Sequence, residues 1–575
     1  MHSLNLCCVE VKCIIIYLRD LGYTPIRRKK PSLASYSNTM VRSIFYILLF
    51  AVFPMAAQEL PFLVKLNPVE IDGLGGIQSF AFGQHDGKWL IAGGRLDGLH
   101  RRQPFASFDL AGHNNQLIVV DPVEKKSWKA SLTGLAAEIQ EQLSSTNMEF
   151  IQEGNILYCL GGYGYSQLQQ DHTTFAKITA IQVAETIKAI TEGKPFDSYI
   201  RQYSESRFQV TGGHLHKIQD TYYLLGGQKF IGRYNPMGPD HGPGFVQEYT
   251  NAIRKFTMTD DGNQLVITHL DSYTDAQNLH RRDYNAREQI MPDGKEGITM
   301  FSGVFRTDVD LPYLNAVNVD ATGYSVNDSF QQLFNHYHCA TMPVYDASQN
   351  EMHTIFFGGI AQYYMENGQI IKDDNVPFVK TIAGVTRHAN GQMIEYVFPI
   401  TMPAFLGAGS EFITNESVPA YSNCVIKAND LEKDSTTVGY IFGGISSSAP
   451  NIFFVNDGSQ SVASNTLFEV QLIKGKTNST NDLKVSDKTI SDLKVYPNPG
   501  TGSYEIRFNL TRVGEVDFQL QDIKGSVLDL QKTCLGVVGE NRVRYEMPAD
   551  LEEGSYLLGI TCRGTTQFVQ LILSR

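Results

Sequence analysis

A short apolar run that ends in a pair of small residues recurs along this chain, and it constrains the fold more than any other feature. Five copies end in Gly-Gly and one degenerate copy ends in Ser-Gly. The copies are Trp89–Gly94, Leu157–Gly162, Tyr222–Gly227, Ile298–Gly303, Thr354–Gly359 and Gly439–Gly444. Internal repetition of this kind indicates several similar units that bury their faces against one another.

Each copy belongs to a longer strand pattern. A strand and a polar turn such as His85–Lys88 precede the copy, and a third strand such as Asn115–Pro122 follows it. A fourth strand comes next, and it contains Trp128 in the first unit. Four antiparallel strands cannot bury both faces alone, but six such units around a common axis can. The sequence therefore predicts an all-β fold in which residues 58–475 form a six-bladed β-propeller.

Two further expectations follow from this arrangement. Where strands crowd near the axis a side chain would clash, so the paired glycines have a structural role. The last unit lacks an outer strand after Asn465–Gly475, and the chain then turns polar. We expect Pro61–Ile71 to supply that strand and thereby to remove an open sheet edge.

The repeat resembles the kelch family, in which a Gly-Gly pair closes the second strand and a Trp lies in the fourth. The first unit matches with Gly93, Gly94, Asp121-Pro122 and Trp128, whereas later units keep the glycines and lose the Trp. The resemblance implies a kelch-like propeller. The family includes sugar mutarotases and copper radical oxidases, but the copper ligands of the oxidases cannot be mapped onto this chain. We therefore expect no metal and no cofactor.

A second domain follows a polar linker at residues 476–492. Residues 493–575 show alternating strands separated by glycine turns, which predicts a small C-terminal β-sandwich. They resemble the type A sorting domain of the type IX secretion system of Bacteroidota, in Tyr496–Pro499, Asp522–Gly525, Gly554–Tyr556 and Phe568–Leu573. Gln570 departs from the basic residue that is frequent in that family. The resemblance implies recognition by the secretion machinery and a location at the cell surface or in the medium.

The N-terminal segment has the pattern of a secretory signal. Residues 40–57 combine Arg42, the apolar run Ile44–Phe53 and small residues before Gln58, which predicts a signal peptide and a mature start at Gln58. Residues 1–39 are interpreted as an over-extended N-terminus. No other segment is long and apolar enough to span a membrane.

Charge and cysteine content exclude some classes of function. The net charge of −12 provides no basic footprint for a nucleic-acid partner. The five cysteines after residue 58 show no metal-ligand spacing and are interpreted as small buried hydrophobic residues. A disulfide between Cys534 and Cys562 remains an open alternative.

The candidate site comes from loop lengths and a repeated tetrapeptide. The connections after the glycine pairs and several connections between units are long, and in a propeller they emerge on one face. Leu-His-Arg-Arg occurs at Leu99–Arg102 and again at Leu279–Arg282, in units that face each other across the axis. We predict that an acidic ligand binds at the central mouth, because arginine suits carboxylates, sulfates and phosphates. The predicted ligand-binding residues are His100, Arg101, Arg102, His280, Arg281, Arg282 and Tyr284.

Two alternatives stay open. The arginines can instead pair with Asp97, Asp109 or Asp283 and brace their loops. The chain is interpreted as a secreted binding protein for a glycan or a protein, and the other hypothesis is a carbohydrate-active enzyme, mutarotase-like or lyase-like, with its site at the mouth. A scaffold alone cannot decide between them.

Overall fold

The structure is a computed structural model that describes residues 60–238, 244–366, 369–475, 490–510, 514–522, 527–537, 539–562 and 565–574. The expected signal peptide, the residues before it and most of the expected linker lie outside these ranges. The described chain is all-β, apart from short 3-10 turns and two helices, α1 (Ala137–Leu143) and α2 (Val183–Thr191). Among the described residues, no helix has both the length and the apolar character needed to cross a membrane.

Residues 60–475 contain six successive antiparallel runs of four strands. The first three runs are β2 (Ala81–His85), β3 (Lys88–Ala92), β4 (Gln116–Asp121), β5 (Lys126–Ser131); β6 (Thr146–Glu153), β7 (Ile156–Ser166), β9 (Lys177–Gln182), β10 (Ile200–Ser204); and β11 (His214–Ile218), β12 (Thr221–Leu225), β15 (Ala252–Asp260), β16 (Leu265–Thr274). The next two are β17 (Asn285–Ile290), β18 (Glu296–Phe301), β19 (Ala316–Val319), β20 (Tyr324–Asn327); and β21 (Thr341–Asp346), β22 (Glu351–Ile360), β25 (Phe378–Arg387), β26 (Met393–Thr401). The last is β27 (Ser410–Thr414), β29 (Ser435–Gly443), β32 (Leu467–Lys474) and β1 (Phe62–Val69).

Additional strands decorate the long connections. They are β8 (Asp171–Thr174), β13 (Gln228–Ile231), β14 (Val246–Tyr249), β23 (Tyr363–Glu366), β24 (Gln369–Lys372), β28 (Ile426–Lys427), β30 (Ile445–Ser447) and β31 (Ser461–Ala463). Strands β13 and β14 lie in the connection that follows β12 of the third run. Because β13 pairs with β8, which belongs to the second sheet, this connection is hydrogen-bonded to the second sheet.

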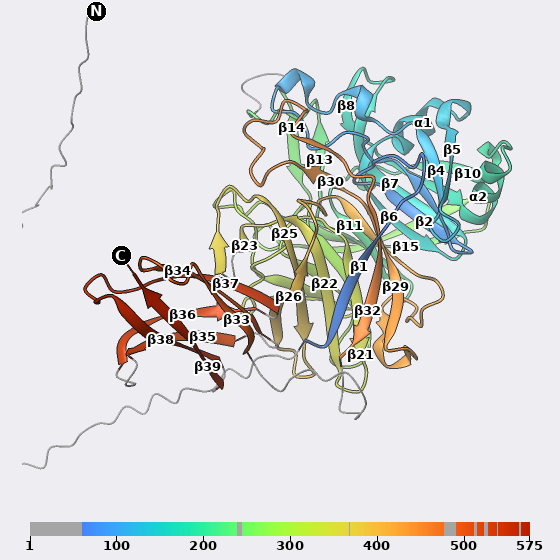
Figure 1. Cartoon of the computed structure of the whole chain (residues 1–575). Helices are drawn as coiled ribbons and strands as arrows, with labels where there is room; N and C mark the ends of the chain where they lie inside the picture. The colour runs from blue at the N-terminus through green and yellow to red at the C-terminus, as the bar shows by residue number, and fades with distance from the viewer. Residues whose placement is uncertain are drawn as a thin grey trace, which may run out of the picture. The chain divides into compact units, whose positions relative to one another are not determined.

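The N-terminal strand completes the last sheet. β1 pairs with β32 along its whole length, from Phe62 opposite Lys474 to Val69 opposite Leu467, and Figure 1 shows the two strands side by side. Phe62 and Val64 are buried in the same apolar cluster as Leu472 of β32. The expectation that Pro61–Ile71 supplies the missing outer strand is confirmed.

The glycine pairs mark the places where neighbouring sheets approach most closely. Gly161 and Gly162 have φ of 60° and 86°, and a Cβ on Gly161 would lie 2.0 Å from the Val210 carbonyl oxygen. In five copies the second glycine donates its N–H to a carbonyl just before the next sheet: Gly94 to Ser145 (2.8 Å), Gly162 to Val210 (2.9 Å), Gly227 to Arg281 (2.8 Å), Gly359 to Leu406 (2.8 Å) and Gly444 to Ile77 (2.8 Å). Because Ile77 precedes the first sheet, the last sheet contacts the first.

A closed circle of backbone hydrogen bonds joins the starts of the innermost strands. The N–H groups donate in turn from Ser79 to Gly409 (2.8 Å), Gly409 to His338 (2.9 Å), His338 to Asp283 (3.1 Å), Asp283 to Gly212 (2.8 Å), Gly212 to Asn147 (3.3 Å) and Asn147 to Ser79 (3.1 Å). We call these six residues the neck ring. Five of them precede the innermost strand of a different sheet, and Asn147 is the second residue of β6 in the remaining sheet, so the six sheets have a propeller-like arrangement.

Residues 490–574 fold into two sheets with their own core. One sheet contains β33 (Ile490–Tyr496), β34 (Ser503–Leu510) and β37 (Gly539–Glu546). The other contains β36 (Val527–Gly536), β35 (Gly514–Asp522), β38 (Gly554–Cys562) and β39 (Thr565–Leu573). Buried and half-buried residues alternate along β34, and Phe508, Phe518 and Leu558 lie in a cluster drawn from both sheets.

Two features of the C-terminal sequence acquire a physical role. Asn498 donates to the Gln570 carbonyl (2.7 Å) and accepts from the Ile572 N–H (2.8 Å), so the Tyr-Pro-Asn-Pro segment holds the terminal strand. Cys534 and Cys562 both pair with Val516, from strands on opposite sides of β35. Two inter-strand spacings of about 4.8 Å each are too long for a disulfide. The two cysteines do not form a disulfide with each other.

Candidate functional site

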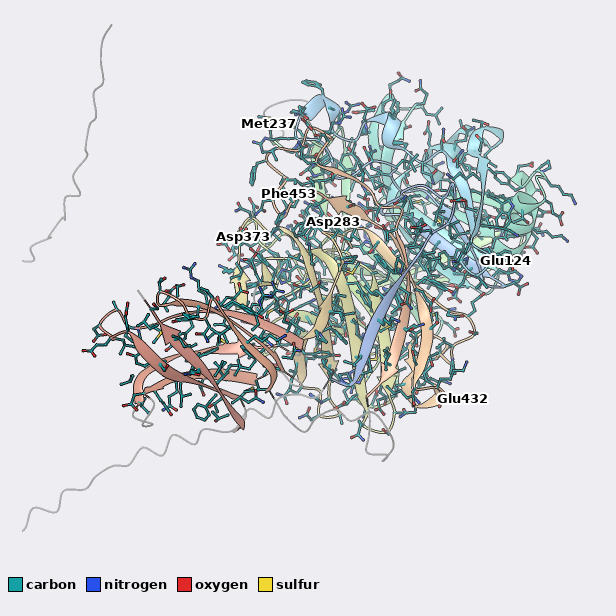
Figure 2. The ribbon with its side chains drawn as sticks, in the orientation of Figure 1. Glu124, Met237, Asp283, Asp373, Glu432 and Phe453 are labelled. Atoms are coloured by element: carbon teal, nitrogen blue, oxygen red, sulfur yellow. The ribbon has the colours of Figure 1, made fainter. Side chains whose placement is uncertain are left out.

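Two cavities lie along the inner strands of residues 60–475, and they meet at the neck ring. Ser79, Asn147, Asp283 and His338 line both cavities. The mouth pocket has a volume of about 320 Å³ and is otherwise lined by the connections after the glycine pairs and by the segments that lead into the innermost strands. The channel pocket has a volume of about 340 Å³ and extends along the inner strands toward the opposite hairpin turns. Figure 2 labels Asp283 of the neck ring and Phe453 of the mouth pocket.

The mouth pocket brings together three of the seven predicted residues. His100 and Arg102 come from the connection after β3, and Arg282 comes from the segment before β17. The two Leu-His-Arg-Arg segments therefore lie at the same end of the inner strands. Aromatic side chains make up much of the remaining wall: Phe108, Tyr163, Phe230, Tyr234, Phe305, Tyr337, Phe453 and Phe454.

Each of these three side chains is held by specific contacts. Arg282 donates from Nε to the Tyr249 hydroxyl (2.9 Å) and forms an ion pair with Asp283. Arg102 lies over the ring of Phe454, with its Cζ 5.4 Å from the centroid. His100 stacks on Phe108, and burial lowers its pKa to about 4, so the imidazole is neutral at neutral pH.

Sequence reasoning missed the most buried cation of the pocket. Arg95 is 3% exposed and lines the mouth pocket directly after Gly94. Its Nε and Nη2 donate to the two carboxylate oxygens of Asp97 (2.7 and 2.5 Å), and Nη2 also reaches the Asp109 carbonyl (3.0 Å). Its Nη1 has no hydrogen-bond partner among the described residues. The sequence did contain one indication of this role: Arg95 directly follows a glycine pair, and the residue after a glycine pair begins a connection that lines the mouth.

The other four predicted residues do not line the mouth pocket, and for Arg281 and Tyr284 the structure corrects the expectation. Arg281 is fully buried, and its guanidinium donates to the carbonyls of Asn278 (2.6 Å), Ser302 (2.5 Å) and Asn315 (3.1 Å). Tyr284 is also buried and donates its hydroxyl to the Leu225 carbonyl (2.9 Å). Buried polar groups require internal hydrogen-bond partners, and these two side chains find theirs on the backbone of the third and fourth sheets and their connections. Both side chains therefore brace the junction between the two sheets.

The remaining two are held outside the pocket. His280 stacks on Tyr249 with ring centroids 3.7 Å apart, and its Nδ1 lies 2.7 Å from the Asn251 side-chain oxygen. Arg101 packs against Gly458, where an added Cβ would lie 2.4 Å from its Nε. Arg282 is paired with Asp283, so part of the predicted bracing occurs as well, whereas Asp97 pairs with Arg95, which lies outside the two tetrapeptides.

The channel pocket contains paired histidines and carboxylates. His216 lies 2.7 Å from Glu288, and His338 lies 2.9 Å from Glu411. Burial opposes the ionisation of Glu288, but His216 and Arg287 outweigh it and lower the pKa of Glu288 to about 2. Within the described ranges, no three His, Cys, Asp or Glu side chains are grouped so that they could hold a metal ion.

The comparisons with known proteins concern export and fold. Residues 494–574 match the family described as the secretion system C-terminal sorting domain. The match indicates secretion. The type IX machinery recognises such domains, so the protein is secreted or held at the cell surface.

No curated protein matches the chain in sequence. A solved structure of YjhT is 10% identical, with 71% of this chain and 99% of that chain covered and a TM-score of 0.37. A copper complex of a fungal alcohol oxidase of the AA5 family is 9% identical, with 89% and 100% covered and a TM-score of 0.36.

Proposed function

We propose that this chain is a secreted, kelch-like, six-bladed β-propeller that binds the carboxylate of an acidic glycan or protein in its mouth pocket. The six four-stranded runs and the closed neck ring support the blade count. The sorting domain at residues 494–574 supports export to the surface or the medium. The C-terminal domain acts as the partner of the type IX secretion machinery, and residues 60–475 carry the binding site.

The observation that carries the binding proposal is the incomplete bonding of Arg95. Nearly all buried polar groups have a partner, and a buried donor without one costs about 1–3 kcal/mol. The Nη1 group of Arg95 is buried and unpartnered within the described chain, and its residue forms part of the pocket wall. A carboxylate that entered the pocket would supply the missing acceptor.

Charge and shape in the pocket support the same conclusion. Arg102 and Arg282 lie in the wall with Arg95, so three guanidinium groups from two connections surround one cavity. Asp97 and Asp283 neutralise two of them, whereas no described carboxylate forms an ion pair with Arg102. Flat aromatic rings such as Tyr234 and Phe454 offer stacking surfaces for a sugar ring or an aromatic side chain.

The test is direct binding by the mature chain. Residues 58–575 are screened on an array of uronic and sialic acid glycans and by calorimetry with any positive glycan. Arg102→Gln and Arg282→Gln each remove one charge-assisted contact, which contributes roughly 1.5–3 kcal/mol, so affinity falls about tenfold or more. The matched control Arg544→Gln lies in the C-terminal domain and leaves affinity unchanged. Binding that is insensitive to both pocket variants contradicts the proposal.

A further inference from the structure

Most exposed large apolar side chains of residues 60–475 lie on the connections that follow the glycine pairs. Phe105 is 74% exposed and Phe454 is 62% exposed, and apolar residues that gather on one face mark an interaction site. We call six of these residues the apolar face: Leu96, Phe105 and Leu110 after β3, and Phe454, Val455 and Val462 after β29.

The two connections that carry the apolar face are joined to each other. Asp97 pairs with Val462 in an isolated antiparallel bridge. Arg102 donates its N–H to the Asn456 carbonyl (2.8 Å), and the Asn456 side chain donates to the Leu99 carbonyl (2.8 Å). Phe454 also lines the mouth pocket, so the apolar face continues into that pocket.

The charges beside the apolar face favour an acidic partner. Arg101, Arg102 and Arg233 form no ion pair with any carboxylate of the described chain. The nearby carboxylates of Asp109 and Asp457 accept backbone N–H groups of their own turns, from Ala111 (3.1 Å) and Ser459 (2.9 Å). The net charge of −12 disfavours a second copy of this chain as the occupant.

We infer that the apolar face docks a polypeptide segment in which an Asp or Glu is flanked by apolar side chains, with the carboxylate in the mouth pocket. The inference rests on the proposed function and names the class of partner. Leucine and valine surfaces are covered favourably by apolar side chains, whereas the hydroxyls of a glycan would lose water there without gaining hydrogen bonds. Aromatic residues and arginine are also the types enriched in protein interfaces.

The test uses the mature chain, residues 58–575, immobilised and panned against a random twelve-residue peptide library. The expected peptides are enriched in Asp or Glu within a few positions of Leu, Ile or Phe. The most enriched peptide is synthesised, and its affinity is measured for wild type, Phe454→Ser, Arg102→Gln and the control Val266→Ser. Val266 is an exposed apolar residue of β16, away from the connections after the glycine pairs.

We expect the affinity for this peptide to fall about tenfold or more in Phe454→Ser and in Arg102→Gln, and to stay unchanged in Val266→Ser. If Arg102→Gln alone weakens binding, the pocket proposal stands and the docking inference fails. If Phe454→Ser alone weakens binding, the pocket proposal fails. Absence of any enriched peptide, binding of uronic oligosaccharides that depends on Phe454, or a dimer in solution that Phe454→Ser dissociates overturns the inference.

Discussion

Arg101 and Arg281 hold the same place in the repeated tetrapeptide, but their surroundings give them different energetic roles. Arg281 is fully buried and satisfies three backbone carbonyls, while Arg101 is exposed. Arg281→Ala leaves those carbonyls without a donor, so we expect a loss of about 3 kcal/mol in the free energy of unfolding. Arg101→Ala serves as the matched control and changes it by less than about 0.5 kcal/mol. Urea denaturation of both variants checks the difference, and equal losses would contradict it.

The sequence could identify the arginine pairs but not which member faces the pocket. Arg281 contacts Ser302, Tyr313 and Asn315, which come after strands β17 and β18 in the sequence. Its burial therefore depends on the folding of the fourth sheet. Arg95 directly follows a glycine pair, but the other residues of the pocket wall that it joins come from several sheets. Burial that depends on distant segments leaves no local pattern in the sequence.

Glu149 gives the fold a pH-dependent stability. Burial raises its pKa to about 8, although the Gly213 N–H donates to Oε1 (2.8 Å) and lowers it in part. The folded chain therefore holds this proton more tightly than the unfolded chain, whose carboxyl titrates near 4.5. The contribution of Glu149 to stability is therefore complete below that value and is lost as the pH rises through about 8.

Glu149→Gln removes this group from the titration. We expect the variant to gain thermal stability over wild type at alkaline pH and to differ little at acidic pH. Glu395, whose pKa burial also raises to about 8, retains a similar dependence in both proteins. Thermal unfolding across the pH range measures the effect, with exposed Glu124→Gln as the control. A constant difference at all pH values would show that ionisation of Glu149 is not involved.

The glycine pairs act at the level of elements, because they set how closely neighbouring sheets approach. Gly161→Ala introduces a Cβ 2.0 Å from the Val210 carbonyl, whereas the same change at Gly87, with φ of 73°, meets no atom within 4 Å. Both variants carry the backbone strain of a positive φ, about 1 kcal/mol. We expect Gly161→Ala to lose several kcal/mol more than Gly87→Ala in chemical denaturation, because only it forces two sheets apart. Equal losses of stability in the two variants would show that the positive φ, and not the contact between sheets, causes the destabilisation.

Strand patterns show which elements the sequence could predict. The missing outer strand of the last unit and the polar sequence after Gly475 were sufficient to predict β1 beside β32. The hairpin of β13 and β14 was not predicted, nor was its pairing with β8 at Ile231 and Thr173. These short strands lie in connections, where polar and apolar residues lack a regular period and pairing depends on the neighbouring sheet.

At the scale of the whole molecule, residues 60–475 and residues 490–573 bury their apolar side chains in separate sets of clusters. The cluster that includes Tyr504, Phe518 and Leu571 draws all its members from residues 490–573, and none of the described residues of that range belongs to the clusters of residues 60–475. Each of the two ranges therefore buries its apolar side chains without a contribution from the other range. The neck ring and the β1–β32 pairing, which hold the six sheets together, also lie entirely within residues 60–475.

This separation allows the export function to be tested without unfolding the binding part. Deletion of residues 493–575 removes the domain that the secretion machinery recognises and leaves every apolar cluster of residues 60–475 intact. We therefore expect the truncated protein to accumulate in the periplasm with the same midpoint of thermal unfolding for its propeller-like part as the full chain. Fractionation of cells followed by immunoblotting locates the protein, and scanning calorimetry of the purified forms compares their stability. Truncated protein at the cell surface or in the medium would contradict the assignment, whereas retention with a lowered midpoint would show that the C-terminal domain also stabilises its neighbour.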